Sequence, residues 1–406
     1  MSANRVFFPN LNGIRFLAAL VVIVHHVEMA KYWFGLPNIY DSSFVGGVFG
    51  ELGIILFFVL SGFLITYLLL EEHRRTGTIG IKAFYMRRIL RIWPLYYLVV
   101  IFSLFILPNF HFFDIPGLSE RINDGFFLKS LAYMSFMPNL GYTIYEHIPY
   151  ATQTWSVGVE EQFYLLWPVL MLYAVRKQKV LQVLVATVII YLLVKTIVVV
   201  GHIADPASVP MLKSWLFWDH FSIDCMALGG ISAYLLFYRK EKALKILFNK
   251  YLQASLYIIL ALITVKGLML PWYSKEVFAI IFMVLILNLA ANKNTIISLE
   301  YKPLNYLGKI SYGLYMYHNF VLTLVLKLFM LSGVVNVGSI GGGIIYHIVS
   351  LGLTIALSAL SYEYFEKWFL GIKTRYTKVQ SGYEVTASEI ALPQAEIPAK
   401  VQPRTA

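Results

Sequence analysis

The sequence predicts an all-α fold, a polytopic membrane helix bundle of about ten transmembrane helices with one re-entrant or interfacial segment. Two observations predict it. Hydrophobic residues make up 59% of the 406 residues and charged residues only 14%, whereas an ordinary soluble domain has about 25% charged residues. The apolar residues also gather in runs of about 20, the length at which an α-helix crosses the hydrocarbon core of a bilayer. The lipid bilayer is therefore the first partner that the chain requires.

Ten such apolar segments follow one another along the chain. They cover residues 11–30, 48–70, 91–107, 155–175, 180–200, 219–238, 251–270, 276–291, 310–331 and 343–369. A shorter apolar run, 126–137, has about half the length of a span. We expect it to be re-entrant or interfacial.

The Lys and Arg residues assign a side to each connection, because short cytoplasmic loops are enriched in them. With the N-terminus inside, the inside connections carry Arg74, Arg75, Lys82, Arg87 and Arg88, then Arg176, Lys177 and Lys179, then Arg239, Lys240, Lys242, Lys245 and Lys250, then Lys293, Lys302 and Lys309. The outside connections hold Lys31, Arg121, Lys129, Lys213 and Lys275. Counting 126–137 as a full span would invert every later loop. The pattern predicts a multi-pass protein of the cell (inner or plasma) membrane with both termini cytoplasmic.

Composition also sets the domain boundaries and excludes several classes. Residues 1–372 form the predicted membrane-embedded domain, and residues 373–406 a polar cytoplasmic tail rich in Ser, Glu, Pro, Ala and Lys, which we expect to be disordered. The net charge of +11 is explained mainly by topology, so no nucleic-acid partner is expected. The single cysteine, Cys225, lies in an apolar run and is expected to be a buried thiol. Neither an HExxH motif nor a cysteine cluster is present, so no metal site is predicted.

Charged or titratable residues inside a span are costly and therefore functional candidates. Arg15 and His26 are 11 residues apart in the first segment, which places them within about 20° on one helix face and about 16 Å apart along the axis. His26 is a candidate general base, and a hydrogen-bonded structural histidine is the alternative. His25 points about 100° away and is expected to pair with Glu28.

A second candidate is the run that opens the third segment. Arg88 and Arg91 are three residues apart and share a helix face. Arginine suits the bidentate recognition of phosphate. Topological anchoring or contact with lipid headgroups is the alternative, and it accounts for Arg74, Arg75 and Lys82 better than for Arg91, which lies a turn inside the span.

The remaining candidates are polar residues in later segments. Glu160 and Glu161 are adjacent carboxylates at the start of the fourth segment, and they face either a polar cavity or a structural Arg partner. The other candidates for lining a cavity are Asp224 in the sixth segment and Ser311, Tyr312 and His318 in the ninth.

Taken together, these segments resemble a known family. The resemblance rests on Arg15-x10-His26 after Leu11-Asn12-Gly13-Ile14, on 57–65 (FFVLSGFLI), on Arg88-x-x-Arg91, on 155–164 (WSVGVEEQFY) and on 310–315 (ISYGLY). In this order, over about residues 8–372, the chain resembles the acyltransferase-3 family of integral-membrane acyltransferases, which O-acylate carbohydrates and some other hydroxyl-bearing compounds.

The resemblance implies roles for these residues. His26 is then the general base that deprotonates the acceptor hydroxyl. Glu160 and Glu161 are further catalytic candidates because of their place inside a span rather than because of the resemblance. Arg15, Arg88 and Arg91 hold the acyl-CoA donor. Two departures stand out. The family often has an Arg where this chain has Ser222, and some members carry a soluble second transferase domain, which we do not expect the short polar tail here to form.

The predicted function is therefore O-acyl transfer from cytosolic acyl-CoA, acetyl-CoA in the first instance, to a hydroxyl of a carbohydrate such as a surface polysaccharide or lipid-linked sugar. Acyl-CoA is a co-substrate, and no bound cofactor is expected. The alternative is a non-enzymatic transporter or flippase in which intramembrane His and Glu relay protons. The sequence leaves open the acceptor, the acyl chain, a covalent intermediate and the oligomeric state.

Overall fold

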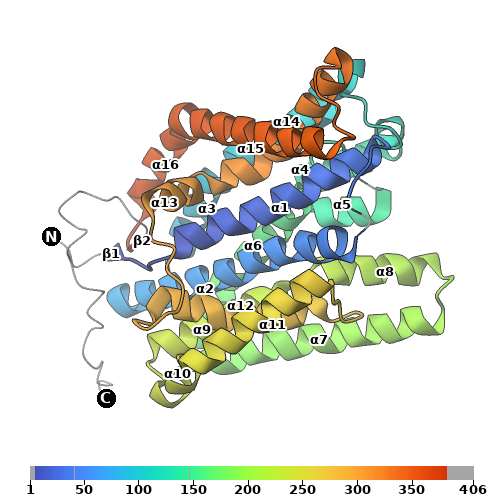
Figure 1. The fold of residues 1–406 in the computed structure, drawn as a ribbon. Coiled ribbons are helices and arrows are strands. Elements are labelled where there is room, and N and C mark those ends of the chain that lie inside the picture. Colours follow the sequence, from blue (N-terminus) through green and yellow to red (C-terminus); the bar gives the residue numbers. More distant parts are fainter. Residues whose placement is uncertain (1–4, 41, 146, 382–406) are drawn as a thin grey trace, which may run out of the picture.

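A computed structural model describes residues 5–40, 42–145 and 147–381, and nearly all of their regular structure is helical (Figure 1). The α-helices are α1 (Leu11–Trp33), α2 (Gly50–Thr76), α3 (Ile81–Ile101), α4 (Phe126–Met134), α5 (Pro138–Tyr145), α6 (Thr154–Arg176), α7 (Val180–Ala204), α8 (Val209–His220), α9 (Ile223–Phe237), α10 (Glu241–Leu247), α11 (Lys250–Lys266), α12 (Ser274–Ala291), α13 (Lys302–Lys309), α14 (Ser311–Ser332), α15 (Ile340–Ser361) and α16 (Lys367–Lys373). Two short strands, β1 (Arg5–Val6) and β2 (Gln380–Ser381), pair in parallel. The predicted all-α bundle is confirmed.

Every predicted span contains a helix. Judged by length and apolar composition alone, however, fewer than ten of the described helices qualify as membrane spans. Within the described residues, eight helical segments are long and apolar enough to cross a membrane, or nine if α10 and α11, bent by 51°, form one span. Among the predicted spans, α6 falls outside this set. Its Glu160, Glu161 and Gln162 interrupt the apolar sequence. The same polar residues that make α6 a functional candidate therefore lower its mean hydropathy below that of a typical span.

The segment 126–137 is not a full span. It forms α4, of 9 residues, which is followed by α5, of 8 residues. Nine helical residues extend about 14 Å, less than half of the roughly 30 Å hydrocarbon core. The expected re-entrant or interfacial segment agrees with this length.

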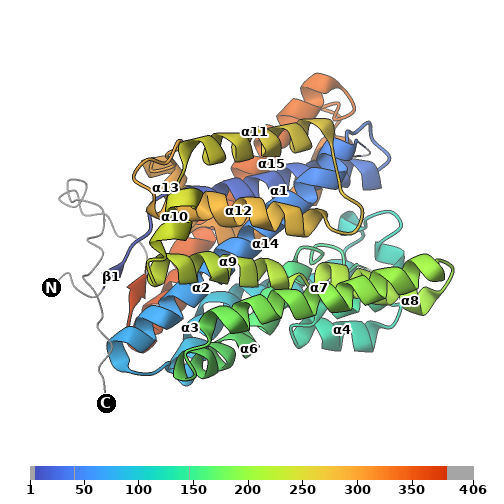
Figure 2. The same ribbon diagram turned by 90° about the horizontal axis from the view of Figure 1, so that it is seen from below.

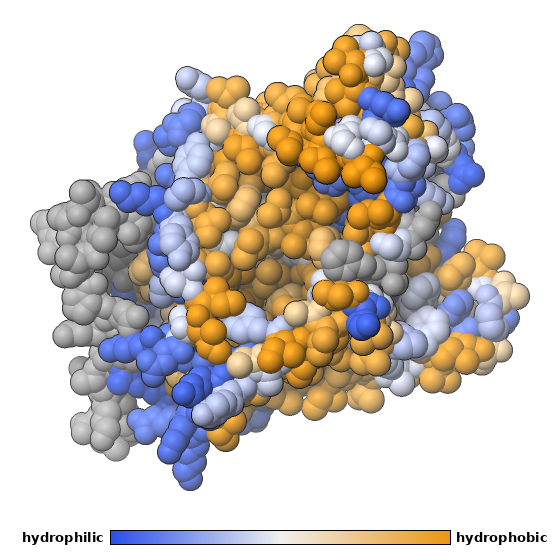
Figure 3. All heavy atoms as spheres, viewed as in Figure 1, coloured by the Kyte–Doolittle hydropathy of each residue, from blue (hydrophilic) through white to orange (hydrophobic). Residues whose placement is uncertain are grey.

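An apolar band crosses the middle of the molecule, and hydrophilic residues gather at both of its ends (Figure 3). The strands β1 and β2 lie at one end together with α10, α13 and α16, and we call this the termini end (Figures 1 and 2). The opposite end, which we call the far end, carries α5 and α8. The basic connections around α10 and α13 thus share an end with both strands, as the charge pattern predicts for loops on one side of a membrane.

Helix α9 lies at the centre of one part of the core, where it packs against α2, α7 and α12 (Figure 2). Glycine makes the closest approach possible. A Cβ atom at Gly62 of α2 would overlap the carbonyl group of Met226, and one at Gly229 of α9 would overlap that of Val59. Small residues at helix interfaces let backbones approach in this way inside membranes.

Most of residues 373–381, the first part of the predicted disordered tail, lie in short helical turns or a strand, with 377–379 irregular. Lys373 is the last residue of α16, residues 374–376 form a 3₁₀ turn, and β2 pairs with β1. The backbone pairing to the N-terminal strand fixes this segment, which the local polarity of the sequence does not predict. The rest of the predicted tail, 382–406, lies outside the described residues.

Candidate active site

The helix α1 positions the first two candidates, because it runs without interruption from Leu11 to Trp33. Its start is tied to the bundle by Asn10, whose side-chain amide donates to the Leu289 carbonyl at 2.8 Å and whose Oδ1 accepts from the Leu299 amide at 2.6 Å. Arg15 lies near the termini end, and its Nη1 donates to Asn12 Oδ1 at 3.1 Å. His26 lies three turns further on along the same face.

His26 meets a second histidine, His318 of α14. The centroids of the two rings are 4.7 Å apart, and the rings are in an edge-on arrangement. His26 Nδ1 donates to the Val22 carbonyl at 2.8 Å, and His318 Nδ1 donates to the Tyr315 carbonyl at 2.7 Å. Both rings are therefore held as the tautomer in which Nε2 carries the lone pair. Within the described residues, no hydrogen-bond partner meets the buried Nε2 of His318.

The expected pairing of His25 with Glu28 is wrong. His25 Nδ1 donates instead to the Val45 carbonyl at 2.9 Å. Glu28 accepts from Lys31 at 3.0 Å and from the amide of Ile39 at 2.8 Å, and it lies 3.4 Å from His347. Lys31 lies three residues further along α1, whereas Ile39 follows α1 and His347 belongs to α15. Spacing within α1 therefore reveals only the first of these partners.

The predicted arginines converge at the termini end. Arg15, from α1, lies within electrostatic range of Arg88 and Arg91, both from α3. The Arg88 guanidinium sits over the rings of Phe84 and Tyr164, 5.7 and 5.6 Å from their centroids. Its Nε is buried and has no hydrogen-bond partner in the described part of the chain. Three cations therefore lie close together here, and at least Arg88 keeps a buried N–H group without a partner among the described residues.

A fourth cation, Lys373 at the end of α16, joins this cluster. It lies within electrostatic range of Arg91, Arg88 and Arg15. Sequence reasoning misses it, because Lys373 falls at the start of the predicted tail and carries no motif. The arginines around the connection between α2 and α3 differ from this cluster, because glutamates pair with them. Arg74 is bonded to Glu71 at 2.6 Å, and Arg87 to Glu72 at 2.9 Å.

The two glutamates of α6 connect neighbouring helices. Glu160 accepts from the hydroxyl of Ser61 on α2 at 2.8 Å and from that of Tyr164 at 3.0 Å. Glu161 Oε2 accepts from the indole of Trp93 on α3 at 2.9 Å, and its buried Oε1 has no hydrogen-bond partner among the described residues. Glu160 also lies within electrostatic range of Arg88 and Arg91. The carboxylates thus border the cation cluster, and no ion pair within 4.0 Å joins them to an arginine in the described structure.

The start of α14 closes the same region. Ser311 is buried, and the hydroxyl of Tyr312 donates to the carbonyl of Ile92, the residue after Arg91, at 2.8 Å. Further along α14, Asn319 donates to the side chains of Thr152 and Gln153, at 2.7 Å each. Gln153 in turn donates to the Met316 carbonyl at 2.7 Å. Sequence reasoning misses this Gln153–Asn319 connection because the residues are 166 positions apart.

Asp224 belongs to a different cluster. It is fully buried in α9, and its electrostatic neighbours are Glu276 and Lys195. Lys195 of α7 bonds Glu276 of α12 at 2.6 Å and lies 3.5 Å from Asp219. Ser222, where the family often has Arg, donates to the Asp219 carbonyl at 2.8 Å. Asp224 is therefore placed with this ion network, apart from the histidine pair and the cation cluster. Among the described residues, no group of three or more His, Cys, Asp or Glu is arranged to hold a metal ion.

Comparison with known proteins decides the family. The family model for an acyltransferase domain, that of the acyltransferase-3 family, matches residues 8–363. The chain belongs to this family. The predicted resemblance is confirmed, and the matched residues include the histidine pair, Arg15, Arg88, Arg91 and both glutamates.

Several curated proteins are similar to the chain. It is 27% identical over 379 residues to the O-acetyltransferase OatA of Staphylococcus aureus, covering 89% of this chain and 57% of that protein. It is 26% identical over 344 residues to the peptidoglycan O-acetyltransferase OatA of Listeria monocytogenes, covering 79% and 50%. The putative peptidoglycan O-acetyltransferase YrhL of Bacillus subtilis is 25% identical over 387 residues, covering 89% and 54%. The chain thus spans about half the length of these relatives. No solved structure matches it.

Proposed function

We propose that this protein is a membrane O-acyltransferase that moves an acyl group, acetyl in the first instance, from acyl-CoA to a hydroxyl of a carbohydrate. The observation that carries the proposal is the arrangement along α1. A cluster of cations surrounds Arg15 at one level, and the His26–His318 pair lies about 16 Å further along the same helix. A donor with anionic phosphates at one end and a reactive thioester at the other fits that separation of roles.

The cations would hold the phosphates. Arginine forms bidentate, charge-assisted hydrogen bonds to phosphate oxygens. Lys373 adds a point charge to Arg15, Arg88 and Arg91. The extended pantetheine arm of CoA then leads the thioester along α1 toward His26. With the termini end in the cytosol of a cell-membrane protein, as the basic loops favour, the donor enters from the compartment that contains acyl-CoA.

His26 would act as the base. Its Nε2 takes the proton of the acceptor hydroxyl while the oxygen attacks the thioester carbonyl carbon. The tetrahedral intermediate then collapses, the C–S bond breaks, and the CoA thiolate leaves as the sulfur takes up that proton. The ring of His318 lies 4.7 Å from that of His26, measured between centroids. In this position His318 would help His26 to take up and release the proton. Protein N–H or O–H donors near the carbonyl stabilise the developing oxyanion.

The relatives favour the acceptor class. Two of those described above carry peptidoglycan in their names, and peptidoglycan glycan is a carbohydrate with free hydroxyls. A glycan hydroxyl is therefore the acceptor that we propose for this chain.

The proposal is tested with purified protein in detergent or nanodiscs and acetyl-CoA labelled in the acetyl group. We expect label to move to soluble peptidoglycan glycan strands, with release of the free CoA thiol, and we expect His26→Ala to abolish the transfer. Lys266→Ala is the control, since that side chain is exposed at the end of α11, a helix that carries none of the proposed site residues. A wild-type protein that neither binds nor consumes acyl-CoA would overturn the proposal.

A further inference from the structure

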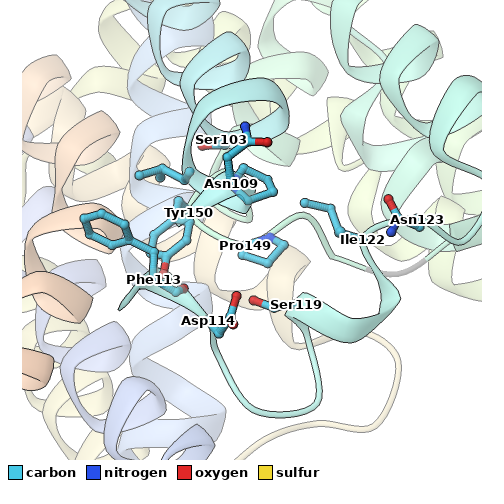
Figure 4. A pocket seen from close by; sticks show the side chains of 11 residues that line it. Ser103, Asn109, Phe113, Asp114, Ser119, Ile122, Asn123, Pro149 and Tyr150 are labelled. Atoms are coloured by element: carbon cyan, nitrogen blue, oxygen red, sulfur yellow. Dashed lines mark hydrogen bonds between the residues drawn. The ribbon is translucent and has the colours of Figure 1, made fainter. Parts of the chain in front are cut away.

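A pocket of ≈ 310 Å³ opens at the far end of the bundle (Figure 4). It is formed by the loop that follows α3, which includes 3₁₀ turns at Leu107–Asn109, His111–Phe113 and Ser119–Arg121, together with Pro149 and Tyr150. Its volume lies at the lower end of the range for ligand pockets, about 300–1,000 Å³. A pocket of this size suits a single small unit, such as one sugar ring.

The lining combines polar groups with aromatic rings. Asn109 uses its amide nitrogen on the Phe105 and Ile106 carbonyls, at 2.6 and 3.2 Å, which leaves Oδ1 to accept. Asp114 uses Oδ2 on His111 at 3.1 Å. Asp114 and Ser119 lie on one side of the pocket and Asn109 on the opposite side (Figure 4).

These groups match the chemistry of a sugar. Ser119 Oγ accepts from the Ile115 amide at 2.9 Å, so its hydroxyl proton is left to donate. Phe113 and Tyr150 also line the pocket, but Tyr150 is nearly fully buried and the Phe113 ring packs against Phe320, so polar groups dominate the accessible lining. Asp114 is the one charged residue among the eleven described residues that line the pocket, so the lining repels an anion rather than attracting it. A neutral polyhydroxylated ring satisfies all of these features.

The pocket is built before any ligand arrives. One wall, near Ile122, is fixed by the buried Lys129, whose ammonium donates to the carbonyls of Arg121 at 3.0 Å and Ile122 at 3.4 Å. The opposite wall is fixed by the hydroxyl of Tyr150, which donates to the Phe113 carbonyl. A preorganised site loses less entropy on binding.

Both helices that carry the histidine pair pack against residues that line this pocket. Phe320 of α14, two residues after His318, packs against Phe113 with ring centroids 5.6 Å apart and against Tyr150 at 6.5 Å. Trp33, the last residue of α1, packs against the same apolar cluster. Trp33 lies seven residues after His26, a distance of about 10 Å along the helix.

We propose that this pocket is a carbohydrate subsite for the acceptor. It holds one sugar unit of the chain at the far end, while a neighbouring unit of the same chain extends along α1 and α14 and presents its hydroxyl to His26. This inference rests on the proposed function and adds to it the place where the acceptor is recognised. Binding energy at the pocket positions a hydroxyl that reacts elsewhere.

The test measures acyl transfer to soluble peptidoglycan glycan strands at varied strand concentration. Asp114→Ala and Asn109→Ala each remove acceptors from the lining. We expect each to raise KM for the strand about fivefold to tenfold, the loss of one or two hydrogen bonds, with KM for acetyl-CoA unchanged. Asp124→Ala is the matched control, because Asp124 is exposed on the same loop and does not line the pocket.

A second measurement separates this proposal from the function it rests on. Binding of an isolated peptidoglycan tetrasaccharide, without donor, is compared for wild type, Asp114→Ala and His26→Ala. We expect Asp114→Ala to weaken binding and His26→Ala to retain it. If wild type transfers acetyl groups while both pocket variants keep wild-type KM and binding, the subsite is refuted and the proposed function stands. If wild type acylates no glycan, both proposals fall.

Discussion

His26 and His318 face each other across the contact between α1 and α14, with ring centroids 4.7 Å apart. Each Nδ1 is engaged by a carbonyl of its own helix, at 2.8 Å for His26 and 2.7 Å for His318. A structural histidine usually uses both ring nitrogens in bonds to the protein when it is buried. Here the buried Nε2 of His318 has no partner among the described residues. That nitrogen, next to His26, is the feature that most favours chemistry over packing.

Replacing each histidine in turn distinguishes the general base from the residue that only lies beside it. We expect His26→Ala to lower kcat by about 10²-fold or more, the usual contribution of general base catalysis. We expect His318→Ala to have a smaller effect on kcat, because it removes only the group that faces the base. Both are measured by transfer of labelled acetyl groups at saturating acetyl-CoA. An unchanged kcat in His26→Ala would exclude it as the base.

Replacing the arginines tests the donor site. Arg88→Ala and Arg91→Ala each remove charge-assisted hydrogen bonds, worth about 1.5–3 kcal/mol, so we expect KM for acetyl-CoA to rise about tenfold to a hundredfold. Lys373→Ala is expected to raise the same KM. Arg74→Ala should matter little, because its guanidinium is already bonded to Glu71 at 2.6 Å. Equal small effects at all four positions would assign the cations to topology alone.

The glycine contact between α2 and α9 predicts a change in stability. Gly62→Ala places a Cβ against the Met226 carbonyl, which is backbone and cannot move aside. We expect a loss of about 1–3 kcal/mol, the usual cost of overpacking, measured as a lower midpoint of thermal unfolding in detergent. The control is Gly352→Ala in α15, where no atom lies within 4 Å of the added methyl. A midpoint as high as the control's would contradict the close packing.

The buried ion network predicts a stability change that can be reversed. Lys195→Ala leaves Glu276 without its 2.6 Å partner, and breaking a buried ion pair costs about 3–5 kcal/mol. The double variant Lys195→Met with Glu276→Gln removes both charges and should recover much of that loss. Lys266→Ala, at an exposed position, is the control. A double variant less stable than Lys195→Ala alone would show that the charges stabilise the bundle individually.

Labelling of single cysteines tests the orientation. In a Cys225→Ser background, cysteines placed at Lys177 and Lys242 should react with a membrane-impermeant maleimide only after the cells are opened. A cysteine in place of Glu120, an exposed residue of the loop at the far end, should react in intact cells. Because Cys225 is buried, we expect it to react little even when it is present, and its replacement is a precaution. The reverse pattern would place the donor cluster on the outside.

The helical bundle is predictable because its signal is local and repeated, and the family because its motifs are short and ordered along the chain. The α1 geometry of Arg15 and His26 follows from helical spacing alone, and the structure keeps that helix intact. What spacing does not provide is the partner across an interface. Neither His318 beside His26 nor Lys373 beside Arg91 follows from local pattern, since each joins helices far apart in the sequence.

The expected pairing of His25 with Glu28 fails because both side chains find other partners. Glu28 bonds Lys31, three residues further along the same helix, as well as the Ile39 amide, and lies near His347, while His25 donates to the Val45 carbonyl. Asp224 lies with Lys195 and Glu276, and its role stays a prediction. Burial requires a charge to find compensation nearby, and a single sequence does not reveal which helices are neighbours.

Because α1 is unbroken, regular helix geometry fixes both the distance and the angle between Arg15 and His26. Inserting or deleting one residue between Arg15 and His26 would shift the ring by about 1.5 Å and rotate it by about 100°, out of line with the arginine. A change of length is tolerated only near whole turns of the helix, so this interval can lengthen or shorten in steps of three or four residues but not in between. The loops around it have no such constraint, and length variation in this chain is expected to accumulate there.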